Sequence, residues 1–281
     1  MLRQNFIYPK IPDTAYHFGS NQFIDVPLRE DGDWRPYLVP EEEQRRNGVE
    51  SSACYIEAQQ HAIAIIQEEQ FNLPDQNYSA RFNALLSDGM PHGGDPLLGA
   101  ESIRKIDGLI PEYMLPFADY IKSWEEFHSF NGGDENTCRA EGKDFLTKWR
   151  LNYDLVFTRD ESLETKLTKL RQALKYSPCP ISVYGRTDSE GNYITKPDGI
   201  NDTHLTLAVH IDEYNFIWVF DTYAPFLKKL PVSYNSDFCM RWSVSKLEAV
   251  KKKTSVWERL WNYFIKEKLI YREFKKFWIK K

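Results

Sequence analysis

Cysteine is scarce in this chain of 281 residues, and no two cysteines lie close together along it. Cys54, Cys138, Cys179 and Cys239 form no CxxC pair, the spacing that most structural zinc sites use. The first residues contain neither a long apolar segment nor a small-residue cleavage site, so we expect no secretion signal. These features predict free thiols in a reducing compartment, with no bound metal or cofactor.

Long hydrophobic runs, internal repeats and low-complexity segments are also missing. A membrane-spanning helix needs roughly 20 apolar residues in succession, and no stretch approaches that length. The net charge of −5 argues against a nucleic-acid-binding surface over the chain as a whole. With 42% hydrophobic and 15% aromatic residues, the chain can build a large core, either as one domain or as two lobes that share a cleft.

One cysteine precedes a long apolar-periodic run. Small and polar residues over 47–53 lead to Cys54, and apolar positions then recur through Ile66, which predicts a loop that delivers Cys54 to the first turn of a buried helix ending near Phe71. Unpaired N–H groups and the helix dipole favour an anion at that end, so we expect the thiolate form to be favoured. On this stretch alone, a small buried side chain is the simpler interpretation.

The order of the remaining elements predicts an α+β fold. Short helices are expected over 79–86, with Ser79 as cap, and over 97–107, closed by Gly108, and residues 118–180 are expected to be largely helical. Alternating apolar residues then predict strands over 181–184, 204–211, 216–221 and 240–244. Helices followed by strands indicate a helical lobe and a sheet lobe.

The predicted hairpin brings a histidine and an acid together. A turn over 212–215 makes paired residue numbers sum to 427, so Thr206 faces Asp221 and His204 is its diagonal neighbour. A histidine held by an acid, together with a cysteine at a helix start, is the nucleophile, base and orienter set of covalent catalysis. A solvent-facing polar pair is the alternative interpretation.

The other histidines compete for the role of base. His61 follows Cys54 on the same helix by seven residues, about 10 Å along the axis, which is too far for proton transfer. His92 lies in a glycine-rich loop and is the second choice. His17, His128 and His210 have no partner that the sequence identifies.

Taken together, the chain resembles a papain-type (C1-like) cysteine peptidase, especially divergent members from bacteriophage and metagenomic sources. Five segments carry the resemblance in order: 33–35, 52–54, 93–117, 204–209 and 221–223. The resemblance implies a two-lobe fold over 1–245, with a helical lobe at about 33–150 and an antiparallel β-barrel lobe at about 1–32 and 175–245. It also implies a cytoplasmic location in a host cell, or a virion-associated one.

Carried over by residue, the resemblance makes Cys54 the nucleophile, His204 the base and Asp221 the orienter, with Gly93 and Gly94 lining the substrate cleft. Asp221 stands where the family has asparagine. The family's oxyanion glutamine usually lies six residues before the cysteine, where this chain has Gly48. Gln44 can serve if the intervening loop is longer, and Asn47 is the runner-up.

Three functions follow from this resemblance. The first is a thiol hydrolase that cleaves protein or peptide substrates. The second is an inactive relative kept as a structural or virion-associated protein, which the uncertain oxyanion donor favours. The third is an acyl-transfer enzyme, such as a deamidase or a transglutaminase.

The last segment, 246–281, adds a basic aromatic tail to this domain. Its 12 Lys and Arg against 4 Glu give a charge of +8, and apolar residues recur at helical spacing after Thr254. We expect one or two amphipathic helices over 254–281 that either pack on the protein's own body or dock on an anionic partner or membrane surface.

Overall fold

The computed structural model describes residues 6–13, 15, 17–18 and 28–247. The chain divides into two units, Met1–Lys246 and Leu247–Lys281. The predicted tail helices and their docking role over 254–281 lie outside the described residues.

A long central helix, α1, spans Cys54–Phe71 as predicted. Its residues are buried on every side over most of its length, as expected for a helix that passes through a core rather than along a surface. The helix ends at Asn72, which adopts the left-handed conformation and donates its N–H to the carbonyls of Gln67 and Glu68.

The helices on one side of α1 are short. Ser79 Oγ accepts the Phe82 N–H at the start of α2 (Ala80–Leu86), so the predicted cap is confirmed. Helix α3 (Pro96–Glu101) begins at Asp95 and continues as the π-helical turn η2 (Ser102–Ile106) before Gly108. The remaining elements of this part are the 3₁₀ turn η3 (Glu112–Met114), the helix α4 (Trp124–Phe127) and the longer helix α5 (Glu135–Lys148). The 3₁₀ turn η1 (Arg35–Tyr37) lies on the sheet side, where the preceding Trp34 N–H donates to the Val209 carbonyl.

The prediction of a largely helical segment over 118–180 is wrong in one part. A ten-residue strand, β3 (Trp149–Thr158), follows α5 directly, and the helix α6 (Leu163–Leu174) comes after it. Trp149, Leu151 and Leu155 are buried at alternating positions of β3. The sequence shows apolar residues at every second position here, which is typical of a strand. Pairing with β8, far along the chain, makes this segment a strand rather than a helix.

Six antiparallel strands form the main sheet, in the order β3-β8-β4-β5-β6-β7. The predicted strands are present, and β7 was missed; among the described residues β3 and β7 lie at the sheet edges, so the expected barrel is an open sheet here. The other strands are β4 (Cys179–Val183), β5 (His204–Ile211), β6 (Ile217–Phe220), β7 (Leu227–Leu230) and β8 (Phe238–Lys246).

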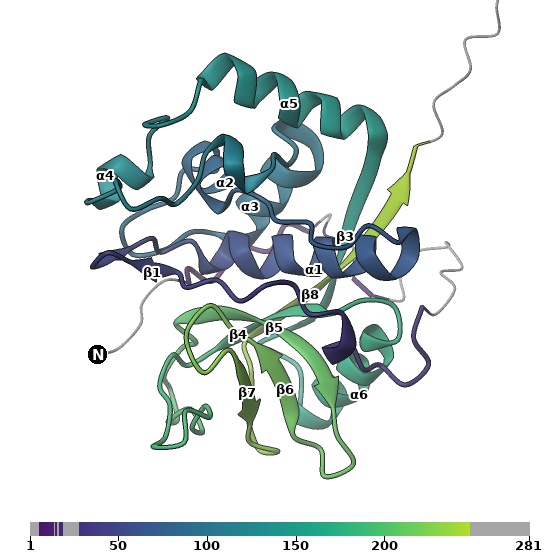
Figure 1. Ribbon diagram of the computed structural model, residues 1–281. Helices are drawn as coiled ribbons and strands as arrows, with labels where there is room; N and C mark the ends of the chain where they lie inside the picture. The colour runs from purple at the N-terminus through teal and green to yellow at the C-terminus, as the bar shows by residue number, and fades with distance from the viewer. Residues whose placement is uncertain (1–5, 14, 16, 19–27, 248–281) are drawn as a thin grey trace, which may run out of the picture. The chain divides into compact units, whose positions relative to one another are not determined.

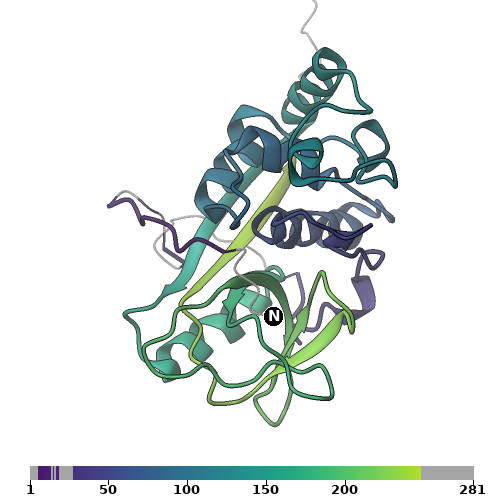
Figure 2. The same ribbon diagram turned by 90° about the vertical axis from the view of Figure 1, so that its left-hand side faces the viewer.

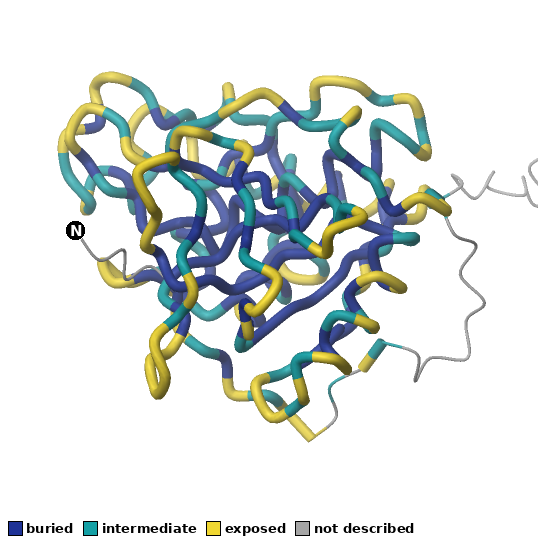
Figure 3. The backbone as a smooth tube through the Cα atoms, turned by 90° about the horizontal axis from the view of Figure 1, so that it is seen from below, coloured by how far each residue is buried: buried dark blue, intermediate teal, exposed yellow. Residues whose placement is uncertain are grey.

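Helix α1 lies between the short helices and the sheet (Figure 1). It packs on β5 and β8 on one side and on α2 and α3 on the other. The long strands β3 and β8 pair with each other and extend beside the helices, as the turned view shows (Figure 2). Figure 3 shows the buried stretches of the chain in the interior and the exposed ones toward the outside. The start of α1 and the start of β5 meet inside the core, because Cys54 and His204 are both buried and the Leu205 backbone contacts the Cys54 thiol.

Candidate active site

The predicted hairpin brings His204 and Asp221 into direct contact. Leu207 pairs with Phe220 and Ala208 with Val219, both with the predicted sum of 427, and the register shifts by one only beyond Ala208. His204 Nε2 lies 2.7 Å from Asp221 Oδ1. Both side chains are fully buried, so the alternative of a solvent-facing polar pair is wrong.

Cys54 is the first residue of α1, as predicted, and its side chain is fully buried. Burial raises the pKa of the Cys54 thiol well above its usual range, although the backbone N–H of Leu205 lowers it. The nearby carboxylates Glu57 and Glu50 raise it further. This direction is opposite to the expected thiolate, because loss of solvent outweighs the helix N-terminus in this closed arrangement. The contact with Leu205 places the sulfur beside the start of β5.

Asp221 is held by groups that the sequence did not suggest. Its Oδ1 also accepts the Thr222 N–H at 2.8 Å, while Oδ2 accepts the Tyr193 hydroxyl at 2.5 Å and forms an ion pair with Lys228. Burial alone would raise the pKa of Asp221, but His204 and Lys228 outweigh burial and hold that pKa below its usual range. Lys228, on β7, is itself 1% exposed.

Tyr223 covers the imidazole and links it to Glu50. Its ring centroid lies 5.4 Å from that of His204, and its hydroxyl donates to Glu50 Oε2 at 2.7 Å. Glu50 Oε1 accepts the Gln44 side-chain amide at 2.7 Å and the Ser52 N–H at 3.2 Å. Glu50 therefore joins three segments around the cysteine, a role that sequence analysis missed.

Gln44 reaches the site because the residues between it and Ser51 loop out as a small hairpin, which brings the two ends of that segment together. Strands β1 (Arg45–Arg46) and β2 (Val49–Glu50) pair with each other, and the Ser51 N–H donates to the Gln44 carbonyl at 3.3 Å. Gln44 is fully buried and its Oε1 accepts the Thr222 hydroxyl at 2.9 Å.

The runner-up for the oxyanion role lies elsewhere. Asn47 is exposed at the tip of the β1–β2 hairpin, and its side chain donates to Asp119 at 3.2 Å. Gly48 shares this tip, with a φ of 80°. Counting six residues back from Cys54 therefore reaches a turn rather than the site.

The two glycines of the predicted cleft lie beside an extended N-terminal segment. A Cβ on Gly94 would lie 2.2 Å from the Tyr55 ring, so packing against α1 also requires glycine there. The Ile7 N–H donates to the Gly94 carbonyl at 3.3 Å, and the Phe6 N–H to the Thr203 carbonyl at 3.1 Å. This segment thus runs between the glycine loop and the residue before His204.

The competing histidines do not join Asp221 and Cys54. His61 packs against Phe220 with the rings tilted and their centroids 5.3 Å apart, and burial lowers the pKa of His61 to about 4. His92 is exposed on its loop. His128 stacks on Trp124, in the helical part. The remaining two lie on other segments. The backbone of His17 forms an isolated parallel β-bridge with Leu155, and His210 Nδ1 lies 3.9 Å from Asp33 Oδ1.

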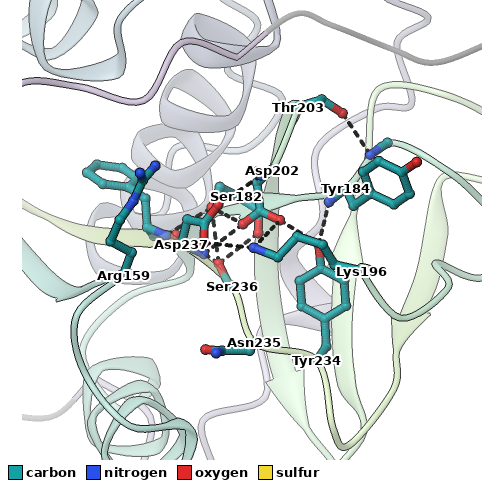
Figure 4. A network of polar contacts seen from close by, with 12 residues as sticks. Arg159, Ser182, Tyr184, Lys196, Asp202, Thr203, Tyr234, Asn235, Ser236 and Asp237 are labelled. Atoms are coloured by element: carbon teal, nitrogen blue, oxygen red, sulfur yellow. Dashed lines mark hydrogen bonds and ion pairs between the residues drawn. The ribbon is translucent and has the colours of Figure 1, made fainter. Parts of the chain in front are cut away.

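A buried polar network holds the segment before His204 (Figure 4). Asp202 and Asp237 each accept the other's backbone N–H, at 2.7 and 2.8 Å. Lys196 Nζ lies 2.7 Å from Asp237 Oδ1 and 3.2 Å from Asp202 Oδ1. Thr203, next in the chain, donates its N–H to the Val183 carbonyl. The network, completed by Ser182, Tyr234 and Ser236, fixes where β5 begins.

The geometry has parallels among solved structures. Xylellain, a cysteine protease from Xylella fastidiosa, superposes with a TM-score of 0.61 at 16% identity, over 88% of this chain and 97% of that one. This chain has the papain-like fold. The Amb a 11 cysteine protease of ragweed pollen, in its proform, gives a TM-score of 0.55 at 16% identity over 82% and 71% of the two chains.

Bromelain from Ananas comosus, solved with the E64 inhibitor, also shares the papain-like fold, with a TM-score of 0.51 at 14% identity over 75% of this chain and 97% of that one. At these identities the likeness concerns the fold alone. No protein-family model and no curated protein sequence matches the chain, and nothing in these comparisons bears on the expected bacteriophage source.

The described part of the chain contains neither a cluster of metal ligands nor a membrane-spanning helix. Across residues 28–247 and the described N-terminal pieces, no three His, Cys, Asp or Glu side chains gather as metal ligands would. Within the same residues, no helix has the length and apolar character needed to cross a bilayer.

Proposed function

We propose that this chain is a papain-like cysteine peptidase that cleaves peptide bonds through an acyl-enzyme on Cys54. The observation that carries the proposal is the 2.7 Å contact between His204 and Asp221 inside the core, beside the cysteine that begins α1. A histidine and a carboxylate are costly to bury, and this arrangement supplies the base and orienter that a thiol nucleophile needs.

Each residue has a distinct role in this proposal. With Nε2 engaged by Asp221, His204 presents Nδ1, which has no hydrogen-bond partner among the described residues. That nitrogen takes the Cys54 proton as the sulfur attacks the peptide carbonyl, and gives it to the leaving amine when the carbon–nitrogen bond breaks. Water then attacks the thioester, His204 removes its proton, and the acid product leaves with Cys54 restored.

Gln44 is the proposed side-chain donor to the developing oxyanion. An amide nitrogen carries two N–H donors, and Glu50 engages the Gln44 nitrogen through one hydrogen bond at 2.7 Å. The other N–H serves the oxyanion, together with the backbone N–H groups at the start of α1. Glu50 and Thr222 fix the orientation of the Gln44 side chain from either end.

An inactive relative is the second candidate, and one observation favours it. Cys54 and His204 are each 0% exposed, so a substrate cannot reach them without movement of the chain. The Phe6–Ile7 segment is the part that lies beside the site. An active enzyme requires this cover to open, whereas an inactive one does not.

Active-site labelling distinguishes the candidates. The full chain is treated at pH 6 with an epoxide inhibitor of thiol proteases, and the adduct is mapped by mass spectrometry. Because His204 takes the thiol proton as the sulfur attacks, we expect modification at Cys54 well ahead of Cys138 and Cys239, although burial raises the pKa of the Cys54 thiol. The modification should be lost in His204→Ala, with the fold retained by circular dichroism. Equal labelling of the three thiols would contradict the peptidase. Peptide products formed with and without an added amine separate hydrolysis from acyl transfer.

A further inference from the structure

An aspartate at the orienter position creates an electrostatic problem. Asp221 is 1% exposed, and an ionised carboxylate at such depth is unfavourable unless a partner compensates it. Its charge also acts on the thiol, because Asp221 raises the pKa of Cys54. A neutral side chain at the same place would orient the imidazole without this effect.

The two oxygens of the Asp221 carboxylate contact different groups. Oδ1 faces the imidazole and the Thr222 N–H, at 2.7 and 2.8 Å. Oδ2 faces away, toward Lys228 and the Tyr193 hydroxyl. Lys228 also donates to the Tyr223 carbonyl, so its ammonium group is held by two acceptors on the same short segment.

We propose that Lys228 is a positioning residue that cancels the charge of Asp221, so that the carboxylate orients His204 as a neutral group would. The two side chains are both buried, oppositely charged and in direct contact. This inference rests on the proposed function of Cys54 and His204. It assigns Lys228 control over the pH range in which the thiol reacts, while Tyr193 fixes the angle of the carboxylate.

Other titratable groups face the same region, and the test must separate Lys228 from them. From α1 come Cys54, Glu57 and His61; from β2, Glu50; from β5, His204; and from the segment between β4 and β5, Tyr193. All of these groups are kept in every variant, and His204 and Tyr193 lose a partner only when Asp221 is replaced. A shift that appears in Lys228→Met and cancels in the double variant therefore reports on the pair.

The test is the pH dependence of Cys54 alkylation by iodoacetamide in the full chain. Lys228→Met leaves the negative charge of Asp221 uncompensated, which opposes formation of the Cys54 thiolate, so the profile moves to higher pH by about one to two units. Asp221→Asn leaves Lys228 uncompensated and moves it to lower pH. The double variant Asp221→Asn/Lys228→Met returns the profile close to that of the parent, since both charges are gone.

Controls separate charge from fold. Lys229→Met removes a neighbouring, more exposed positive charge, and its profile stays with that of the parent. Thermal unfolding of all variants supplies a second measurement, in which the double variant is more stable than either single one. If Lys228→Met does not fold, the alkylation profiles of Asp221→Asn and of the double variant still test the inference.

Two results overturn the inference. In the first, Lys228→Met folds and keeps the parent profile. In the second, the double variant loses as much stability in thermal unfolding as the two single variants together, which shows that the two charges are independent. If iodoacetamide never labels Cys54 in the parent, the proposed function itself fails, which is a different outcome from an unchanged profile.

Discussion

The Ser51 amide donates to the Gln44 carbonyl oxygen at 3.3 Å, with the whole β1–β2 hairpin between them. This contact returns the chain to the site after an excursion of a few residues. It makes the distance along the sequence from Gln44 to Cys54 a poor guide to their separation in space.

Gln44→Ala tests the oxyanion role that follows from this contact. We expect kcat for peptide cleavage to fall by about 10²–10³, as when other oxyanion donors are removed, while alkylation of Cys54 continues. Asn47→Ala is the matched control, since Asn47 is exposed at the hairpin tip. Equal losses in the two variants would assign the effect to the hairpin rather than to the donor.

The N-terminal segment is expected to limit access to Cys54. Ile7→Pro removes the N–H that donates to Gly94, and Ile7 is 43% exposed, so its side chain contributes little packing. Losing a hydrogen bond of about 1 kcal/mol favours the open state roughly fivefold. The alkylation rate of Cys54 should rise by that factor, whereas Ile7→Ala, which keeps the N–H, should not change it. A rate unchanged in Ile7→Pro would show that another part of the chain provides the cover.

Glu112 predicts a pH dependence of stability. Burial raises its pKa to about 7, despite a hydrogen bond from the Phe117 N–H. Because the folded pKa is raised, its stabilising contribution is complete below the unfolded value near 4.5 and is lost as the pH rises through about 7. Glu112→Gln keeps the acceptor without the charge, so it should match the parent at pH 4 and gain about 3 kcal/mol at pH 8. Urea unfolding at the two pH values measures this, and a gain of equal size at pH 4 would contradict it.

Lys196 is expected to stabilise the network before His204. It lies between Asp202 and Asp237, and burial together with Asp237 raises the pKa of Asp202. Lys196→Met leaves two buried carboxylates facing each other, so we expect a loss of about 3 kcal/mol in the free energy of unfolding at pH 7. The loss should shrink in Lys196→Met/Asp237→Asn. A single variant as stable as the parent would show that hydrogen bonds alone hold the network.

The elements around the site followed from local patterns. Apolar spacing after Cys54 predicted α1 to within its last turn, because a buried helix repeats every 3.6 residues. The hairpin numbering placed His204 near Asp221, although the pairs next to the turn are one residue off. A β-bulge between Ala208 and His210 restores the predicted register on the side of His204. The helix prediction depends only on residues close together along the chain. The hairpin prediction depends on a single turn between two adjacent strands.

Tertiary structure alone decided the environment of these residues. Lys228 and Tyr193 reach Asp221 from separate segments, and no spacing in the sequence predicts that convergence. The pKa of Cys54 is raised rather than lowered, because desolvation depends on everything packed around the thiol and not on the helix that carries it. The sequence determined the candidate nucleophile, base and orienter, and packing determined their burial and the charged groups around them.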